Sequence, residues 1–172
     1  MGTAAAIRSA TAADSGAFAR IYNHYVATTI VSFEEAAVTE ADMAVRLAAI
    51  ESLRWPWLVA EGADGVCGYA YADRWKARAA YRHTVEVTVY IDPAQIGRGL
   101  GTQLYAALFD RLRYTDAHAA IGVISLPNAA SVALHEKFGL RKAAHFTEVG
   151  YKFGRWVDVG YWQRQLPAGN NS

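Results

Sequence analysis

The pattern of apolar and polar residues predicts a strand and two helices in the first third of the chain. Residues 5–11 are typical of a short strand that ends in a helix N-cap, for which Thr11 and Asp14 are the candidates. The apolar side chains of the first helix recur at helical spacing, at Phe18, Ile21, Tyr22 and Tyr25. Residues 38–50 repeat this pattern behind Thr39, a third candidate N-cap. One face of that helix would carry Met43, Leu47 and Ile50.

The middle of the chain predicts three strands followed by a helix. Residues 56–61 and 65–75 have strand composition and are joined by a turn that contains Gly62, Asp64 and Gly65. Residues 81–91 are strongly β-branched, which favours a third strand. The helix is predicted over 101–114, where leucines recur every four residues beside two aromatic residues.

The last third predicts a strand at 119–126, a short helix and a terminal pair of strands. Asn128 is a candidate N-cap for the helix, and Gly139 is a candidate C′ glycine at its end. Residues 142–166 are typical of two strands around a turn near Gly154. Residues 168–172 have the composition of a tail. No repeat or linker interrupts the pattern, so we expect one domain over 1–167, a mixed sheet with helices on both sides.

Composition narrows the class of protein. Hydrophobic residues make up 53% of the chain and charged residues 19%, which is typical of a globular domain. The formal net charge of +1 gives no reason to expect a nucleic-acid partner. Every purely apolar run is far shorter than the roughly 18–20 residues that span a bilayer, and the N-terminus lacks a signal-peptide core. The single cysteine, Cys67, excludes an internal disulfide. We therefore expect a cytoplasmic protein with no membrane partner.

The stretch IDPAQIGRGLGTQLYAAL (91–108) joins a predicted strand to a predicted helix through Gly97, Gly99 and Gly101. Without Cβ atoms these residues let the backbone turn tightly and approach a ligand closely. The N-terminus of the following helix offers unpaired N–H groups to phosphate oxygens. The spacing is not that of a dinucleotide fingerprint, and no lysine follows Gly101 as in a P-loop. The junction indicates a phosphorylated ligand, and a tight turn without a ligand is the alternative interpretation.

The whole junction, VTVYIDPAQIGRGLGTQLY, resembles the acyl-coenzyme A signature of the GNAT acetyltransferase superfamily. Further stretches resemble its phosphinothricin N-acetyltransferase family in the same order: IYNHYV, WPWLVAE, GYAYADRWKARAAY, LPNAASVALHEKFGL and GYKFGRWVDVGYWQRQL. The resemblance covers nearly the full length. It implies an α/β GNAT fold with a central mixed, mostly antiparallel sheet flanked by helices, and acetyl-CoA as co-substrate. One position departs from the superfamily pattern, because Ile96 stands where Gln or Arg is usual and Gln95 is displaced by one.

The resemblance also assigns catalytic residues. Glu86 is a carboxylate inside an apolar strand, which by periodicity alone favours an outward-facing residue or an ion-pair partner. In the family a glutamate at this place is the general base, and a dry site would raise its pKa towards neutrality. His135 matches a histidine that shares proton handling, and Tyr105 matches a hydroxyl near the thioester that acts as oxyanion donor or as acid for the thiolate. By pattern alone, both are typical of core residues.

The remaining site residues follow from the same resemblance. Lys76 and Arg78 lie in a basic stretch suited to the carboxylate and phosphinate of an amino-acid analogue. Phe33 and Glu34 match a loop on the substrate side, and Tyr81 is a candidate wall of the pocket. No metal is implied. The residues expected to bind the cofactor are Val89, Tyr90, Ile91, Gly97, Arg98, Gly99, Leu100, Gly101, Thr102, Asn128 and Ser131.

The function predicted is transfer of acetyl from acetyl-CoA to the α-amino group of phosphinothricin or methionine sulfoximine. Methionine sulfone, another small amine, or a non-catalytic acyl-CoA sensor are the alternatives. A protein or ribosome modifier would need an open groove, whereas the loops after Ile30 and Trp75 favour a small pocket. Family members are commonly homodimers, and we expect Trp156 and Trp162 to supply apolar surface for such an interface.

Overall fold

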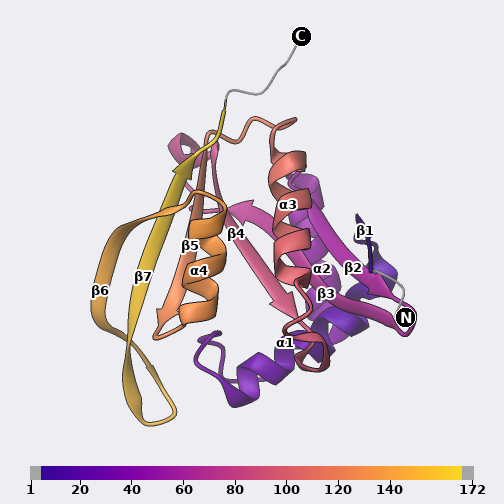
Figure 1. Cartoon of the computed structure of the whole chain (residues 1–172), viewed down its shortest axis with the longest axis horizontal. Coiled ribbons are helices and arrows are strands. Elements are labelled where there is room, and N and C mark those ends of the chain that lie inside the picture. The colour runs from indigo at the N-terminus through magenta and orange to yellow at the C-terminus, as the bar shows by residue number, and fades with distance from the viewer. Residues whose placement is uncertain (1–4, 168–172) are drawn as a thin grey trace.

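The computed structural model describes residues 5–167, so the predicted tail at 168–172 lies outside the described residues. Seven strands form one sheet in the order β1-β2-β3-β4-β5-β7-β6 (Figure 1). Every neighbouring pair is antiparallel except β4 and β5, which run parallel. The mixed, mostly antiparallel sheet is thereby confirmed. The strands are β1 (Ala6–Ser9), β2 (Trp57–Gly62), β3 (Gly65–Arg74), β4 (Thr84–Ile91), β5 (Ala119–Leu126), β6 (Arg141–Lys152) and β7 (Arg155–Gln165).

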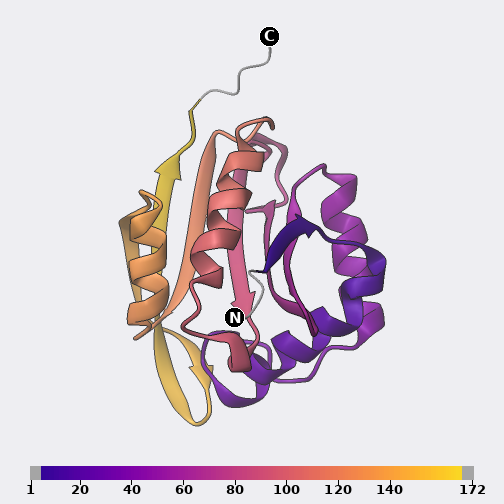
Figure 2. The same cartoon turned by 45° about the vertical axis from the view of Figure 1, so that its right-hand side comes forward.

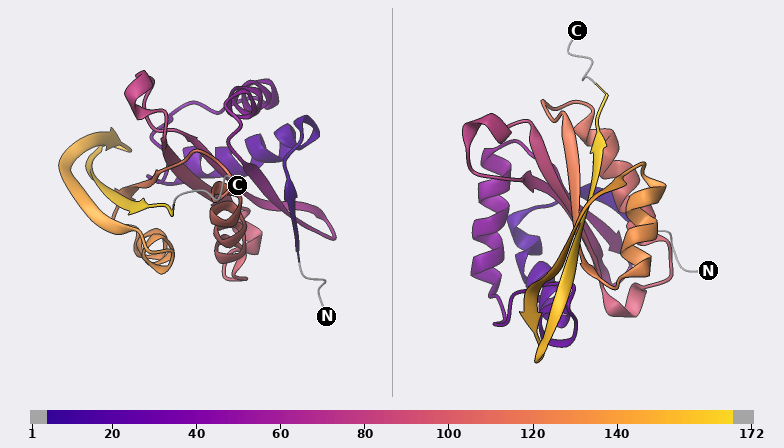
Figure 3. Two further views of the ribbon diagram at one scale, coloured as in Figure 1. Left: turned by 90° about the horizontal axis from the view of Figure 1, so that it is seen from above. Right: turned by 90° about the vertical axis from the view of Figure 1, so that its left-hand side faces the viewer.

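Helices cover both faces of the sheet, as the sequence predicts (Figure 3). Their bounds are α1 (Ser15–Thr28), α2 (Glu40–Ser52), α3 (Leu100–Leu112) and α4 (Ala129–Lys137). Helices α1 and α2 pack on one face, in a cluster with Trp57, Val59 and Tyr69. Helix α3 packs on the other face, in a cluster that includes Leu58 and Val85. Because side chains alternate along a strand, β2 contributes to both clusters and the sheet separates two cores.

The helix starts show which capping residues act. Asp14 is the N-cap of α1, and its Oδ2 also accepts a hydrogen bond of 2.8 Å from the backbone N–H of Thr11, across one 3₁₀ turn. Thr11 therefore begins the 3₁₀ turn and Asp14 holds the N-cap position of α1, without a side-chain hydrogen bond to that helix. The second prediction is confirmed directly, since Oγ1 of Thr39 accepts from the backbone N–H of Asp42 at 3.1 Å.

The same alternation decides which way the functional strand β4 presents its side chains. Val85 and Val87 are buried in the cluster under α3. Glu86 and Tyr90 must therefore point to the opposite face, where α1 and α2 lie. Tyr90 does so, with its ring 5.1 Å from that of Tyr22 in an edge-on contact. The carboxylate is therefore on the α1–α2 face, opposite the buried Val85 and Val87.

The sheet opens in its middle. In the described part of the chain, β4 and β5 pair only from Thr84 to Glu86, opposite Ala119 to Ile121. Beyond Glu86 the two strands diverge, as Figure 1 shows below the label of β4. The edge of β4 from Val87 onward consequently has no backbone partner on its β5 side. Such a split leaves room for a ligand between two strands of one sheet and exposes N–H and C=O groups to it.

The β6–β7 hairpin corrects one expectation. Trp156 is 61% exposed and belongs to an apolar surface with Tyr151 and Phe153. Trp162 was expected to join such a surface, and this is wrong: it is only 2% exposed, in the core under α3. Its indole N–H donates to a carboxylate oxygen of Glu136 at 3.1 Å. Alternation puts the two tryptophans on the same face of β7, and they differ in position along it: Trp162 pairs with Gly122 of β5 in the body of the sheet, whereas Trp156 lies near the hairpin turn, beyond the residues that pair with β5.

Candidate active site

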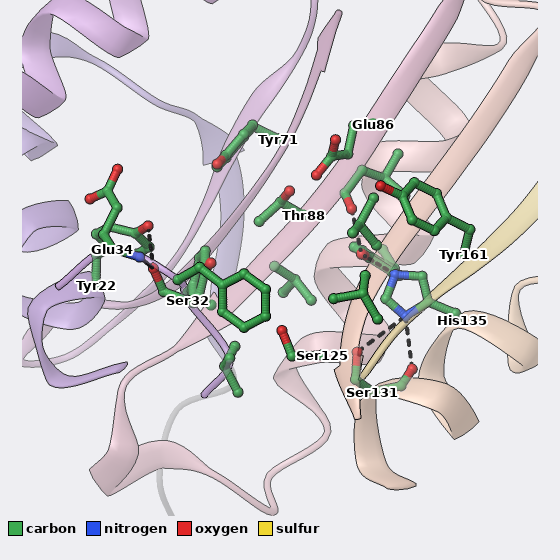
Figure 4. A pocket seen from close by; sticks show the side chains of 18 of the residues that line it. Tyr22, Ser32, Glu34, Tyr71, Glu86, Thr88, Ser125, Ser131, His135 and Tyr161 are labelled. Carbon is green, nitrogen blue, oxygen red and sulfur yellow. Dashed lines mark hydrogen bonds between the residues drawn. The ribbon is translucent and has the colours of Figure 1, made fainter. Parts of the chain in front are cut away.

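A cavity of about 710 Å³ occupies the opening between β4 and β5 (Figure 4). Its walls come from both faces of the sheet, so it passes through the split. Eight residues predicted from the sequence line it: Phe33, Glu34, Glu86, Val89, Tyr90, Tyr105, Ser131 and His135. The structure therefore brings together the three candidate catalytic residues and both residues of the predicted substrate-side loop.

Glu86 lies at the point where the strands separate, because it is the last residue of β4 that pairs with β5. Its carboxylate is half-buried, and this burial raises the pKa above that of a free glutamate. The negative charge of Asp73, its neighbour across β3 and β4, raises the pKa further, while the positive charge of Lys76 lowers it. A carboxyl group with a raised pKa at the edge of a cavity is suited to general-base catalysis near neutral pH.

Tyr105 and His135 form a buried hydrogen-bonded pair from α3 and α4. The Tyr105 hydroxyl oxygen lies 3.0 Å from Nε2 of His135 and 3.3 Å from the carbonyl oxygen of Val87. Nδ1 of His135 donates to the carbonyl oxygen of Ser131 at 2.7 Å, since a carbonyl can only accept. Burial lowers the pKa of His135, so the ring is neutral and Nε2 accepts from Tyr105. Burial also raises the pKa of Tyr105, so this group is a hydrogen-bond donor rather than a phenolate.

A glycine of β5 makes room for the histidine. A Cβ atom at Gly122 would lie 2.3 Å from Cδ2 and 2.5 Å from Nε2 of His135. The imidazole therefore lies against the backbone of β5, in space that a side chain at position 122 would occupy. The sequence pattern of residues 119–126 does not distinguish Gly122 from a glycine that only weakens the strand. Its role is visible only once α4 is docked on β5.

The face of the cavity nearer to α1 and α2 carries polar groups that the sequence analysis did not select (Figure 4). Arg46 of α2 donates to Oε1 of Glu34 at 2.7 Å, and its guanidinium lies 5.6 Å from the centre of the Tyr22 ring. The Tyr22 hydroxyl and Oγ of Ser32 are 2.6 Å apart. Oε2 of Glu34 is buried and has no hydrogen-bond partner among the described residues. Arg46 lies on the polar side of an amphipathic pattern, which is why its sequence context indicates only a solvated residue.

Lys76, Arg78 and Tyr81 are not placed on the walls of this cavity. Lys76 and Arg78 line a separate cavity of about 510 Å³, together with Arg74 and Arg82. The ring of Tyr81 lies edge-on to that of Trp75, at 5.2 Å. Of the three, only Lys76 acts on Glu86, through its charge. Their contact with a substrate stays a prediction.

A further cavity, of about 330 Å³, lies at the glycine-rich junction. Gly97 and Gly99 have φ values of 85° and 74°, and a Cβ atom on either would point into open space. Both therefore need glycine for the turn, and both leave their backbone accessible. Gly101 lies in the first turn of α3, and a Cβ atom there would be 3.4 Å from a methyl group of Leu134 of α4.

The cavity at the junction fits a diphosphate. Its walls include the N-terminus of the 13-residue helix α3, where unpaired N–H groups favour an anion. Five predicted cofactor residues besides Gly97 line it: Ile91, Gly99, Leu100, Gly101 and Thr102. Lys137 of α4, which the sequence analysis did not select, adds a cation there, with Nζ 3.4 Å from Oγ1 of Thr102.

Arg98 and Asn128 are placed elsewhere. Arg98 is exposed and does not line the cavity at the junction. The Asn128 side chain accepts from the backbone N–H of Ser131 at 3.0 Å, which caps α4. Their contacts with a cofactor stay predictions. Among residues 5–167, no group of three or more His, Cys, Asp or Glu could hold a metal ion. No helix in that range is long and apolar enough to cross a membrane.

Comparisons with known proteins agree with this geometry. Residues 7–160 match the family described as acetyltransferase (GNAT) domain. Phosphinothricin N-acetyltransferase of Streptomyces viridochromogenes is 44% identical over 164 residues, which cover 94% of this chain and 89% of that protein. The L-methionine sulfoximine/L-methionine sulfone acetyltransferase of Salmonella typhimurium is 38% identical, over 93% of this chain and 94% of that protein. The crystal structure of a phosphinothricin acetyltransferase from Sinorhizobium meliloti in complex with acetyl-CoA superposes with a TM-score of 0.93 at 34% identity, covering 99% of this chain and 92% of that one.

The family match and these relatives identify the chain as an acetyl-CoA-dependent N-acetyltransferase. The chain belongs to the GNAT acetyltransferases, and within them to the phosphinothricin N-acetyltransferase family.

Proposed function

We propose that this enzyme transfers the acetyl group of acetyl-CoA to the α-amino group of phosphinothricin or the similar amino-acid analogue methionine sulfoximine. The names of the two relatives described above support this class of acceptor. The observation that carries the proposal is the position of Glu86, at the split of the sheet and on the wall of the 710 Å³ cavity. The cavity size suits a small acceptor beside the pantetheine arm of the donor.

The two reactants approach from opposite faces of the sheet. The diphosphate of the donor binds the backbone N–H groups of Gly97 to Thr102 with Lys137 nearby, on the face of α3 and α4. The acceptor amine enters from the face of α1 and α2, onto which Glu86 projects. Backbone groups of Val89 and Ile91 pair with the pantetheine arm along the free edge of β4.

Acetyl transfer needs a neutral amine and an acceptor for its protons. Glu86 as carboxylate removes one proton from the ammonium. The nitrogen then attacks the thioester carbon, so that the C–N bond forms and the C–S bond breaks. The second amine proton passes to the departing thiolate, and the first leaves Glu86 for solvent. The Tyr105 hydroxyl turns its one proton away from Nε2 of His135 and donates a hydrogen bond to the charge that develops on the thioester.

A turnover assay tests the proposal. Purified enzyme is mixed with acetyl-CoA and either compound, and released thiol is measured together with the acetylated product. Saturable, acceptor-dependent thiol release with phosphinothricin or methionine sulfoximine is expected. Absence of turnover with both compounds would remove the acceptor class, and methionine sulfone and other small amines, tested in the same assay, are then the alternative acceptors.

A non-catalytic acyl-CoA sensor is the alternative of a different class. It would keep the cavity at the junction and make no use of Glu86. Binding of acetyl-CoA by calorimetry without turnover of any amine would favour the sensor. Half-burial and a raised pKa for Glu86 favour the enzyme, because a sensor has no need of a base there.

The enzyme is also proposed to be a homodimer. Large apolar side chains on the β6–β7 hairpin are exposed: Phe146, Val149, Tyr151, Phe153 and Trp156. Tyr151 and Trp156 are in contact, with ring centres 4.8 Å apart, and exposed aromatic side chains are enriched at protein interfaces. Sedimentation analysis should give twice the chain mass for the native protein and a shift to the monomer for Trp156→Ser. A native monomer would contradict this part of the proposal.

A further inference from the structure

Lys152 is a buried cation that has no part in the proposed mechanism. It lies at the end of β6 and is only 2% exposed. Its ammonium donates to the carbonyl oxygen of Ser32 at 2.6 Å and to that of Val26 at 2.8 Å. These carbonyls belong to the loop after α1 and to the last turn of α1. One side chain of the hairpin therefore binds the N-terminal third of the chain at two points.

A second contact joins the same two segments. A Cβ atom at Gly150, two residues before Lys152, would lie 2.3 Å from Cε2 and Cζ of Phe33. The Phe33 ring therefore lies directly on the backbone of β6. Figures 2 and 3 show the tip of the hairpin beside the loop that follows α1. Phe33 lines the 710 Å³ cavity, so this contact sets the position of one of its walls.

Ser32 links the loop to the acceptor end of the cavity. Its carbonyl oxygen accepts from Lys152, and its hydroxyl oxygen accepts from the backbone N–H of Glu34 at 3.1 Å. The same hydroxyl is 2.6 Å from that of Tyr22. A shift of Ser32 would thus move Phe33 and Glu34 together.

We propose that Lys152 and Gly150 form a latch between the β6–β7 hairpin and residues 29–36, which holds Phe33 and Glu34 in place at the acceptor end of the cavity. Lys152 is then a positioning residue for the acceptor and makes no contact with it. The assignment of this end to the acceptor rests on the proposed function. The latch itself does not, because it is defined by contacts within the chain.

The presence of a lysine at this buried position indicates that its hydrogen-bond donors, and not only its bulk, are needed. Among residues 5–167, no carboxylate forms an ion pair with Lys152, and a ring, that of Phe153, lies 4.9 Å from Nζ. Burial lowers the pKa of this ammonium, which the charge of Glu35 opposes. Burying a cation without a counter-ion is unfavourable, and a Met would fill the same space. An ammonium group adds donors that fix two carbonyl oxygens at once.

Lys152→Met, which keeps the bulk and removes the donors, tests the latch by amide hydrogen exchange and by steady-state kinetics. Faster exchange is expected across residues 29–36, including the N–H of Glu34. KM for the amino-acid acceptor should rise about 10-fold, because Phe33 and Glu34 are then no longer held in the position that receives the acceptor. KM for acetyl-CoA should stay at the wild-type value. Lys142→Met is the matched control, since Lys142 lies on the same strand and is exposed.

Gly150→Ala provides a second test that leaves Lys152 in place. The added Cβ should displace Phe33 and raise the acceptor KM, again without effect on acetyl-CoA. The latch would be overturned if Lys152→Met left hydrogen exchange over residues 29–36 unchanged. It would also be overturned if Gly150→Ala raised KM equally for the acceptor and for acetyl-CoA. Exchange is measured without acceptor, so faster exchange in an enzyme that acetylates neither analogue would uphold the latch and reject the acceptor class.

Discussion

The Tyr105 hydroxyl oxygen lies 3.0 Å from Nε2 of His135, and the second ring nitrogen of that histidine is bound to the Ser131 carbonyl oxygen at 2.7 Å. The second bond fixes the tautomer and therefore the direction of the first. Tyr105 cannot direct its proton at a ligand without leaving either Nε2 or the Val87 carbonyl oxygen, 3.3 Å away. The Tyr105 proton therefore reaches a ligand only when it leaves these acceptors, and because burial raises the pKa of Tyr105, a hydrogen bond to developing charge is favoured over complete proton transfer.

Tyr105→Phe removes this donor and leaves Nε2 of His135 buried without a partner. We expect kcat to fall about 10- to 100-fold, within the range for loss of one oriented donor or acid. The same change should lower the free energy of unfolding by about 1–3 kcal/mol. Steady-state kinetics and urea denaturation measure the two effects. A wild-type kcat in a destabilised variant would restrict Tyr105 to a structural role.

Gly122→Ala should displace His135, because the new methyl group would lie 2.3 Å from Cδ2 of the ring. We expect a loss of about 1–3 kcal/mol in stability from overpacking, with a fall in kcat similar to that of His135→Ala. Gly16→Ala in α1 is the control, because only the flexible end of Glu40 lies near its added Cβ, at 3.3 Å. If Gly122→Ala kept full kcat, the imidazole would not need its place on β5.

The pH dependence of the reaction should report the neighbours of Glu86. Its raised pKa means that the active carboxylate is lost as the pH falls through that raised value, so kcat/KM decreases on the acid side. Asp73→Asn removes a charge that raises the pKa and should move the acid limb to lower pH. Lys76→Met removes a charge that lowers the pKa and should move the limb to higher pH. Identical acid limbs in all three proteins would assign the limb to another group.

Lys137 should contribute to the donor and not to the acceptor. Lys137→Met is expected to raise KM for acetyl-CoA several-fold at low salt, with less effect at high salt, because the interaction is between exposed charges. A short acetyl thioester without the diphosphate should be used equally well by both proteins. Lys142→Met serves as the control. A uniform loss with both donors would contradict a contact to phosphate.

The helices and strands could be predicted where the spacing of apolar residues or a helix cap is clear in the sequence. The leucines of α3 and the Thr39 cap of α2 are examples in which local sequence and tertiary packing agree. The depth of a strand residue could not be predicted in the same way. Trp156 and Trp162 have similar strand contexts, and only Trp162 pairs with β5 and packs into the cluster under α3.

The chemistry of the site was only partly visible in the sequence. Glu86 and His135 could be selected through resemblance to a family, and the structure places both on one cavity. Arg46 and Gly122 could not, since an arginine on a polar helix face and a glycine in a strand are common in any fold. Their roles depend on which elements meet across the split sheet. Arg78 lines a separate cavity, and this too depends on how the loop after β3 folds.

The central claim is that Glu86 is the base for acetyl transfer to a small amine, and the turnover number of Glu86→Gln measures it most directly. The substitution keeps the shape of the side chain and removes its basicity. With saturating acetyl-CoA and phosphinothricin, and an unchanged dissociation constant for acetyl-CoA by calorimetry, kcat should fall about 100-fold or more. A kcat equal to that of the wild type would contradict the account.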